Sequence, residues 1–143
     1  MKKVISISAL FFIFLLAACN KKDTAVSKTV LLTSGTWKIT AVVSDNDANG
    51  TYETDDFASF SLCFTDNFWS FSASSVVTMD EGPTKCDVAD PQTETGTWNF
   101  TQNETHLMIN ADEWKLEELT TSTLKWKEEY SGGRSSLVTF TKR

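Results

Sequence analysis

Residues 36–43, TWKITAVV, place an apolar side chain at every second position and so decide the fold. Trp37, Ile39, Ala41 and Val43 would share one face of an extended strand, because successive side chains point to opposite faces. Lys38, Thr40 and Val42 would share the other face. This pattern predicts a β-strand that is half-buried, with Trp37 and its neighbours toward the core.

Seven further segments carry the same period, at 67–73, 75–80, 95–102, 105–110, 113–119, 123–130 and 134–142. From residue 102 onward, short turn-forming links such as Ser131-Gly132-Gly133 separate them. Short links between sequential strands predict an antiparallel meander. We therefore predict an all-β domain of eight antiparallel strands, closed into an up-and-down barrel that leaves no free edge. A two-sheet sandwich is the alternative, and only residues 55–61 have room for a short turn of helix.

The N-terminus has the features of an export signal. Lys2 and Lys3 precede an apolar run over residues 4–16, which is too short to span a bilayer. The run ends in Leu16-Ala17-Ala18-Cys19, which is similar to a bacterial lipobox, so we predict a signal peptide over 1–18 and lipidation of Cys19. Two or three acyl chains anchor a protein to a membrane without a transmembrane helix. Because Asn20 rather than aspartate follows Cys19, we expect the bacterial outer membrane, on either face.

The segment 19–33 is polar, lacks aromatic residues and is predicted to be a flexible tether, with the barrel domain over 34–143. Loss of residues 1–18 leaves 11 basic residues against 19 acidic ones, a net charge of about −8. Nucleic acids are therefore excluded as expected partners, because their phosphates need Lys or Arg.

The cysteine count predicts a disulfide. With Cys19 lipidated, Cys63 and Cys86 remain as a pair in an oxidising compartment. Closing a loop of this length stabilises a fold by about 3 kcal/mol in the chain-entropy model. A metal site on the two thiolates is the alternative, but no CxxC and no nearby histidine support it.

The order of several short motifs resembles the lipocalin-like domains of bacterial lipoproteins. Leu32-Thr33-Ser34-Gly35-Thr36-Trp37 is similar to the Gly-x-Trp opening of lipocalins, and Gly96-Thr97-Trp98 repeats it. Ser74-Ser75 stands where such domains often carry Asp-Gly or Asn-Gly. The resemblance implies that Trp37 closes one end of the barrel, beneath a cationic side chain of the last strand, either Lys142 or Arg143.

An acidic stretch runs from Asp45 to Asp56. Its spacing is similar to that of a calcium-binding EF-hand loop, with expected Ca2+ ligands at Asp45, Asp47, Asn49, Thr51, Glu53 and Asp56. Position twelve is Asp56 rather than glutamate, and no flanking helices are predicted. A plain polar loop between strands is the competing interpretation, because Asp, Asn and Gly favour turns.

Catalysis has little support, and we predict that the protein is not an enzyme. His106 is the only histidine and has no nucleophile assigned to it. Glu117, Glu118, Glu128 and Glu129 lie near Lys115, Lys125 and Lys127 on adjacent predicted strands, which indicates charge pairs on a solvated face rather than a carboxylate active site.

Two functions follow from these features. The first is a lipoprotein whose barrel binds a small apolar or amphipathic molecule, as the resemblance implies. The second is a structural or interaction module of the cell envelope, with a filled barrel and an exposed acidic loop. The twelve Phe and Trp residues left after removal of 1–18 are numerous for a small barrel, so interior volume distinguishes the two functions.

Overall fold

A computed structural model describes residues 25–143. The signal peptide, Cys19 and the first part of the expected tether lie outside the described residues. The first element is the helix α1 (Lys28–Thr33), and the strand β1 (Thr36–Asp45) follows it. No helix among residues 25–143 combines the length and the apolar character needed to cross a membrane.

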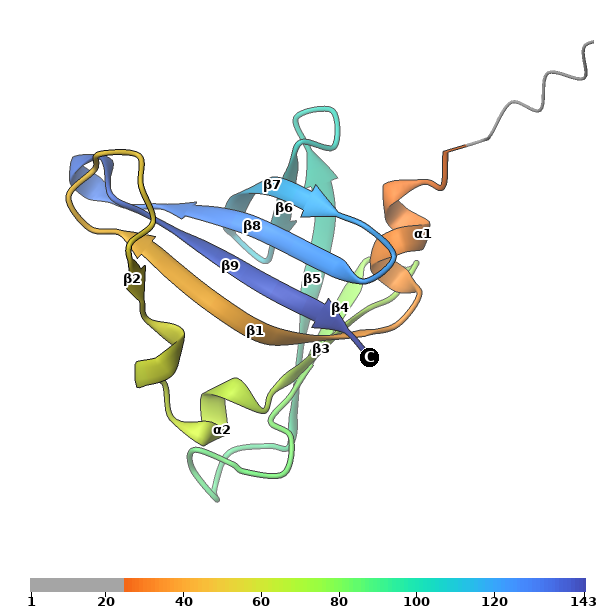
Figure 1. The fold of residues 1–143 in the computed structure, drawn as a ribbon. Helices are drawn as coiled ribbons and strands as arrows, with labels where there is room; N and C mark the ends of the chain where they lie inside the picture. The colour runs from red at the N-terminus through yellow and green to blue at the C-terminus, as the bar shows by residue number, and fades with distance from the viewer. Residues whose placement is uncertain (1–24) are drawn as a thin grey trace, which may run out of the picture.

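Within residues 25–143, nine antiparallel strands form one sheet that closes on itself (Figure 1). After β1 they are β2 (Thr54–Asp55), β3 (Phe68–Phe71), β4 (Val76–Asp80), β5 (Thr93–Thr101), β6 (His106–Ile109), β7 (Asp112–Leu119), β8 (Thr123–Glu129) and β9 (Ser135–Lys142). Eight of them, β1 and β3 to β9, pair in chain order, and β1 also pairs with β9, while β2 adds a two-residue extension to β1. The predicted eight-stranded up-and-down barrel is confirmed, with β2 as an additional strand.

One prediction about β1 is wrong. Ile39 pairs with Phe140, but the next paired residue is Ala41, so Thr40 forms a β-bulge. A bulge moves every following side chain to the opposite face. Val42 and Ser44, rather than Ala41 and Val43, therefore continue the buried face that Trp37 and Ile39 begin.

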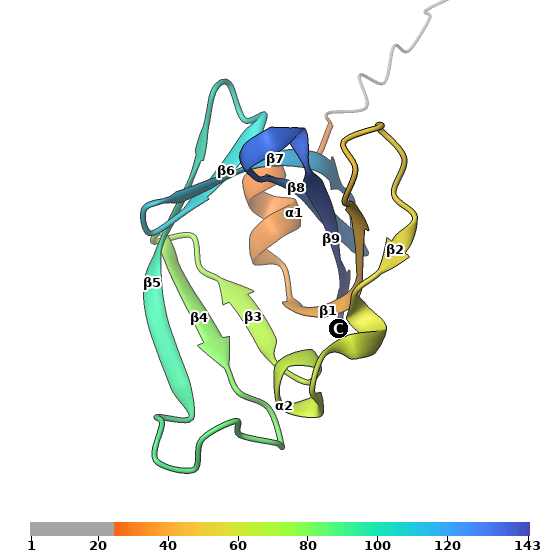
Figure 2. The same ribbon diagram turned by 90° about the vertical axis from the view of Figure 1, so that its left-hand side faces the viewer.

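The expectation of a flexible tether over 19–33 does not hold for residues 28–33. Ser27 caps α1 by accepting a hydrogen bond from the Val30 amide at 3.2 Å, and Leu32 is fully buried. Figure 2 shows α1 lying across one end of the barrel, between β3 and β7. Six residues are too few to show a helical period or to fold as an isolated helix, so tertiary packing stabilises α1.

The connection between β2 and β3 contains the expected short helix. A 3-10 turn (Phe57–Ser59) is followed by α2 (Leu62–Thr65). Figure 1 shows these elements beside the lower part of the barrel, next to the loop that joins β4 to β5. The β3–β4 turn forms with Ser75 in the left-handed region, at φ 62°, where glycine or asparagine is usual.

The core lies inside the barrel and consists of aromatic and branched side chains. Its fully buried members include Trp37, Leu107, Leu124 and Phe140. Burying one side chain of this size contributes about 1.5–3 kcal/mol, so these residues hold the closed sheet together.

Candidate functional site

A cavity of about 300 Å³, here called the aromatic cavity, extends from the core of the barrel to the exposed side chains of Phe60, Phe64 and Tyr130 and is therefore open to solvent. Strands β1, β3, β7, β8 and β9 and the segment 56–64 contribute to its wall. The lining residues are Ile39, Val42, Asp56, Ser59, Phe60, Phe64, Trp69, Trp114, Trp126, Glu128, Tyr130, Ser136, Val138 and Phe140. A cavity lined mainly by apolar side chains with a few polar groups is typical of sites for small molecules.

Aromatic rings form much of the wall of this cavity. Trp114 and Trp126 stack with ring centroids 5.0 Å apart and an interplanar angle of 11°. Phe140 lies 4.3 Å from Trp126 and 6.3 Å from Trp69, again between centroids. These residues meet because each occupies an inward position on its strand, where period-two alternation places apolar side chains.

A group of polar side chains lines another part of the cavity wall. The Glu128 carboxylate accepts hydrogen bonds from Trp126 Nε1 at 3.0 Å and from the Tyr130 hydroxyl at 2.8 Å. Ser44 donates to Asp56 Oδ2 and lies 2.6 Å from the Ser136 hydroxyl. This arrangement holds two carboxylates at fixed positions on the cavity wall.

These surroundings shift the pKa of the Tyr130 phenol. Burial is the main reason that its pKa lies above the ordinary value of 10.0. A hydrogen bond with Ser136 lowers the pKa, whereas a hydrogen bond with Glu128 and the negative charges of Glu128 and Asp56 raise it. The charges of Glu128 and Asp56 thus add to the effect of burial on the Tyr130 phenol.

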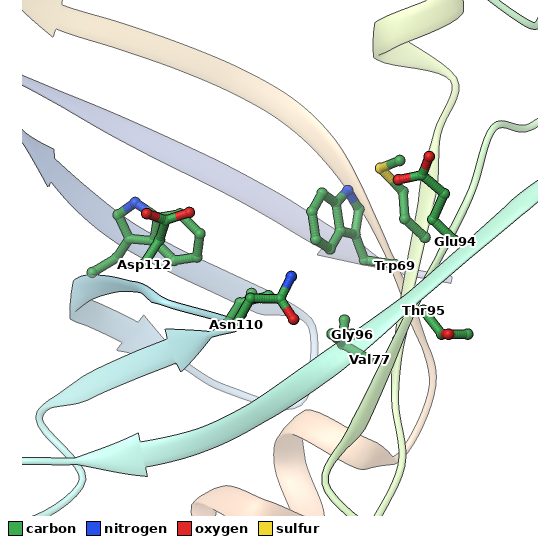
Figure 3. Close-up of a pocket in the computed structure, with 10 residues that line it drawn as sticks. Trp69, Val77, Glu94, Thr95, Gly96, Asn110 and Asp112 are labelled. Carbon is green, nitrogen blue, oxygen red and sulfur yellow. The ribbon is translucent and has the colours of Figure 1, made fainter. Parts of the chain in front are cut away.

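A second space of about 220 Å³, here called the side pocket, shares Trp69 and Trp114 with the aromatic cavity. Figure 3 shows the indole of Trp69 between Glu94 on one side and Asn110 and Asp112 on the other. The two spaces therefore lie against the same pair of tryptophan rings.

Gly96 is required at the edge of the side pocket by a close approach of Asn110. The Asn110 side-chain oxygen accepts a hydrogen bond from the Thr97 amide at 3.0 Å. A Cβ at Gly96 would lie 2.4 Å from that oxygen. The glycine thus lets the β6–β7 turn seat against β5.

The two spaces are lined by carboxylates and by no basic side chain of the described residues. Four carboxylates line the two spaces, from Asp56 and Glu128 in the aromatic cavity and Glu94 and Asp112 in the side pocket, and the described chain places no Lys, Arg or His in either lining. In the described part of the chain, three ion pairs join Lys115 to Glu117, Lys125 to Glu118 and Lys127 to Glu129.

The position of Glu128 differs from the prediction. The sequence pattern grouped Glu128 with the solvated charges of β7 and β8, whereas the structure places this side chain on the wall of the aromatic cavity. The period of β8 contained the signal, because Glu128 shares the face of the buried Leu124 and Trp126. The segment containing Phe60 and Phe64 was also not recognised as part of a site.

The end of the barrel beneath α1 is closed by Trp37, which is fully buried. Its Nε1 donates to the Leu32 carbonyl at 2.8 Å, and the Lys142 ammonium lies 4.6 Å from its ring centroid. Lys142 is thus the cation over Trp37, while the Arg143 guanidinium lies 4.9 Å from the ring of Phe68. Burial lowers the pKa of Lys142 below its ordinary value.

The disulfide between Cys63 and Cys86 is present and joins α2 to the β4–β5 loop, with the two Cα atoms 5.0 Å apart. Buried polar side chains surround it. With its amide oriented to satisfy both partners, Asn67 donates to the Cys63 and Glu81 carbonyls at 2.9 Å. Glu81 in turn accepts from the Cys86 amide at 3.2 Å, so the bridge and these contacts tie the two loops together.

Several of the predicted calcium ligands form hydrogen bonds within their own loop or with Ser44. Asp45 accepts from the Asn49 and Gly50 amides at 3.1 and 2.9 Å, and the Asn49 side chain accepts from the Thr51 amide at 2.7 Å. Asp56 is engaged by Ser44 at the cavity wall. Among residues 25–143, no group of three or more Asp, Glu, His or Cys side chains is arranged to hold a metal ion.

The pKa of Asp45 fits its role in the loop. Burial raises it, but the hydrogen bonds from the Gly50 and Asn49 amides, with smaller contributions from Asp47 and Ala48, lower it by more, so the net shift is downward. Hydrogen bonds from backbone amides stabilise the charged carboxylate. The acidic residues at the start of the loop therefore organise its backbone.

His106 lies on β6, and its Nδ1 is 2.9 Å from the Thr105 hydroxyl. It lines neither the aromatic cavity nor the side pocket. The structure thus brings His106 to a polar recess that it shares with Lys115 and Lys127. Trp114, Glu128 and Tyr130 line both this recess and the aromatic cavity.

Comparison with known proteins adds a family. A family model described as a lipocalin-like domain matches residues 33–126, which is more than half of the chain. Among solved structures, a DUF4847 family protein from Bacteroides vulgatus ATCC 8482 is similar, with a TM-score of 0.50 and 13% sequence identity. That match covers 78% of this chain and 94% of the other, and it supports the fold alone. No curated protein matches the chain. The chain belongs to the lipocalin-like domain family.

Proposed function

We propose that the protein is a lipid-anchored protein of the bacterial cell envelope whose barrel binds a small apolar or amphipathic molecule without catalysing a reaction. The observation that carries this proposal is the aromatic cavity of about 300 Å³. Binding would bury the apolar part of a ligand against tryptophan and phenylalanine rings, at about 25 cal/mol per Å² of apolar surface removed from water. A lipocalin-like domain is in general a binding fold, which supports the same function.

The alternative function, a structural module with a filled barrel, predicts an interior occupied by its own side chains. The aromatic cavity favours ligand binding over this alternative, because twelve Phe and Trp residues still leave a space of that volume.

Native mass spectrometry of protein extracted from its own membrane tests the binding function. We expect a co-purifying small molecule, and we expect Val138→Phe to abolish it, because Val138 lines the cavity and a larger side chain would fill it. Leu137→Phe on the outer face of β9 is the matched control and should retain the molecule. The proposal would be contradicted if no small molecule co-purifies with the wild-type protein and the protein also binds no apolar dye.

The lipid anchor has a separate test. Metabolic labelling with a fatty-acid analogue should mark the wild-type protein, and Cys19→Ser should abolish the label and leave a precursor or a soluble form. Absence of label from the wild-type protein would refute lipidation. The membrane in which the labelled protein fractionates then tests the outer-membrane assignment.

A further inference from the structure

The wall of the aromatic cavity combines π faces with carboxylates. We propose that its ligand is an organic cation, a small amphipathic amine or quaternary ammonium compound. This inference rests on the proposed binding function and adds the chemical class of the ligand.

The aromatic side chains supply the first part of the recognition. Trp114, Trp126 and Trp69 all line the cavity, and the first two are stacked at 5.0 Å. The negative face of an aromatic ring attracts a cation, most strongly when the ring belongs to tryptophan and the site is shielded from water. The same rings bury the apolar part of an amphipathic ligand.

The carboxylates supply the second part. Glu128 is held by Trp126 and Tyr130, with one hydrogen bond to each oxygen, and about two acceptor positions of the carboxylate remain free. Asp56 is held by Ser44. Within residues 25–143, neither carboxylate forms an ion pair with a side chain of this protein. A ligand ammonium group could therefore pair with either one.

Basic residues lie beside these carboxylates but outside the lining of the aromatic cavity. His106, Lys115 and Lys127 share an adjacent recess with Glu128, and the two lysines pair with Glu117 and Glu129 at 2.8 and 2.9 Å. Arg134 lines a shallow outer recess together with Asp56 and Tyr130, and its Nε donates to the Ser131 carbonyl at 3.5 Å. A fatty acid or another anionic ligand would place its charge beside carboxylates without a cation in the cavity lining to neutralise it, which is unfavourable.

The side pocket reinforces the charge preference. Glu94 and Asp112 lie on either side of Trp69, which also lines the aromatic cavity (Figure 3). Both spaces thus present carboxylates around shared tryptophan rings. Fields of one sign raise the local concentration of the oppositely charged ligand.

Three probes with one carbon skeleton and different charge test the inference. They are 4-phenylbutylamine, 4-phenylbutanol and 4-phenylbutanoate, which at about pH 7 are a cation, a neutral molecule and an anion. Calorimetric titration of the full protein, with quenching of tryptophan fluorescence as a second readout, gives the affinities. We expect the amine to bind at least ~10-fold more tightly than the alcohol and the carboxylate to show no saturable binding.

Two conservative variants remove the charges and keep the shape of the cavity. Glu128→Gln and Asp56→Asn should each weaken amine binding by about 3-fold to 10-fold and leave alcohol binding unchanged. Glu129→Gln is the matched control, because Glu129 follows Glu128 on β8 but pairs with Lys127 and does not line the cavity. The Glu129→Gln variant should bind the amine and the alcohol as tightly as the wild-type protein does. Thermal melts verify that every variant is folded.

The outcomes separate the two proposals. Equal binding of amine and alcohol, or tighter binding of the carboxylate, would overturn the cation inference and leave the binding function standing. Unchanged amine affinity in both charge variants would also overturn it. If none of the three probes binds and no molecule co-purifies, both proposals fail.

Discussion

Lys142 shows how one side chain joins the last strand to the first element of the domain. Its ammonium donates to the Leu31 carbonyl at 2.8 Å and to the Ser34 hydroxyl at 2.7 Å, and it lies over the ring of Trp37. Burial lowers its pKa, so part of this favourable interaction offsets the cost of taking the charge out of water. The net effect is to hold α1 against the closed end of the barrel.

We expect Lys142→Met to lower the free energy of unfolding by about 1–2 kcal/mol, because it removes the charge from Trp37 and leaves the Leu31 carbonyl without its donor. Denaturant unfolding provides the measurement. Lys38→Met is the control, since the Lys38 ammonium lies 5.8 Å from the Phe68 ring and makes no hydrogen bond among the described contacts. If Lys142→Met lowers the free energy of unfolding no more than Lys38→Met does, Lys142 does not hold α1 against the end of the barrel.

At the scale of elements, the turn after β4 depends on Gly82. Its φ is +67°, and a Cβ there would lie 2.4 Å from the Asp66 carbonyl oxygen, which precedes β3. The glycine thus allows the β4–β5 loop to pass closely over the end of α2, beside the disulfide.

Gly82→Ala should destabilise the fold by about 2–4 kcal/mol, because it adds a backbone clash to the strain of a left-handed residue. Gly50→Ala isolates the strain alone, since Gly50 has φ +87° and nothing within 4 Å of an added Cβ. We expect Gly50→Ala to lower the free energy of unfolding by about 1 kcal/mol. Equal losses for the two variants, measured by chemical unfolding, would rule out the close approach.

The β1–β2 loop is organised by its own hydrogen bonds, which leads to a prediction about calcium. Asp45→Ala removes the acceptors of the Asn49 and Gly50 amides. We therefore expect the free energy of unfolding to fall by about 1–2 kcal/mol, both with calcium and with a chelator. Wild-type thermal melts should not change at millimolar calcium. A calcium-dependent rise of the melting temperature that Asp45→Ala abolishes would instead support the ion-binding loop.

At the scale of the whole molecule, hydrogen-bonded carboxylates couple stability to pH. The pKa of Asp80 is lowered chiefly by the Gln92 amide, and that of Glu113 chiefly by the Thr101 hydroxyl, from ordinary values of 3.8 and 4.5. Asp45 is shifted in the same direction. Groups of this kind stabilise the fold fully above their unfolded pKa and lose that contribution as the pH falls through their folded pKa.

The melting temperature should therefore stay nearly constant from about pH 7 to about pH 5 and fall below about pH 4. The double variant Asp80→Asn, Glu113→Gln should melt lower at neutral pH and show a shallower acid decline. Calorimetry across this range provides the measurement. A melting temperature that rises toward pH 3 would contradict the assignment of these carboxylates as stabilising groups.

The strands and the closure of the sheet followed from local patterns. The predicted segments 113–119 and 134–142 differ from β7 (Asp112–Leu119) and β9 (Ser135–Lys142) by one residue at their first position. Alternation and turn residues act between near neighbours in the chain, so the sequence carries them directly. The Cys63–Cys86 pairing was predicted on a different ground, from the number of cysteines and the expected oxidising compartment.

The candidate site depended on contacts between residues far apart in the chain. The bulge at Thr40 exchanges the faces of β1 only when β9 pairs with it, and α1 forms only where Leu32 can be buried against the barrel. The position of Glu128 in the cavity wall likewise depends on the closed sheet. Sequence by itself thus determined eight of the nine described strands and their order, because local alternation and turns encode them, and it determined the disulfide through the number of cysteines. Only the tertiary structure decided which carboxylates meet the tryptophan rings, because the shear of a closed barrel sets which inward side chains lie together.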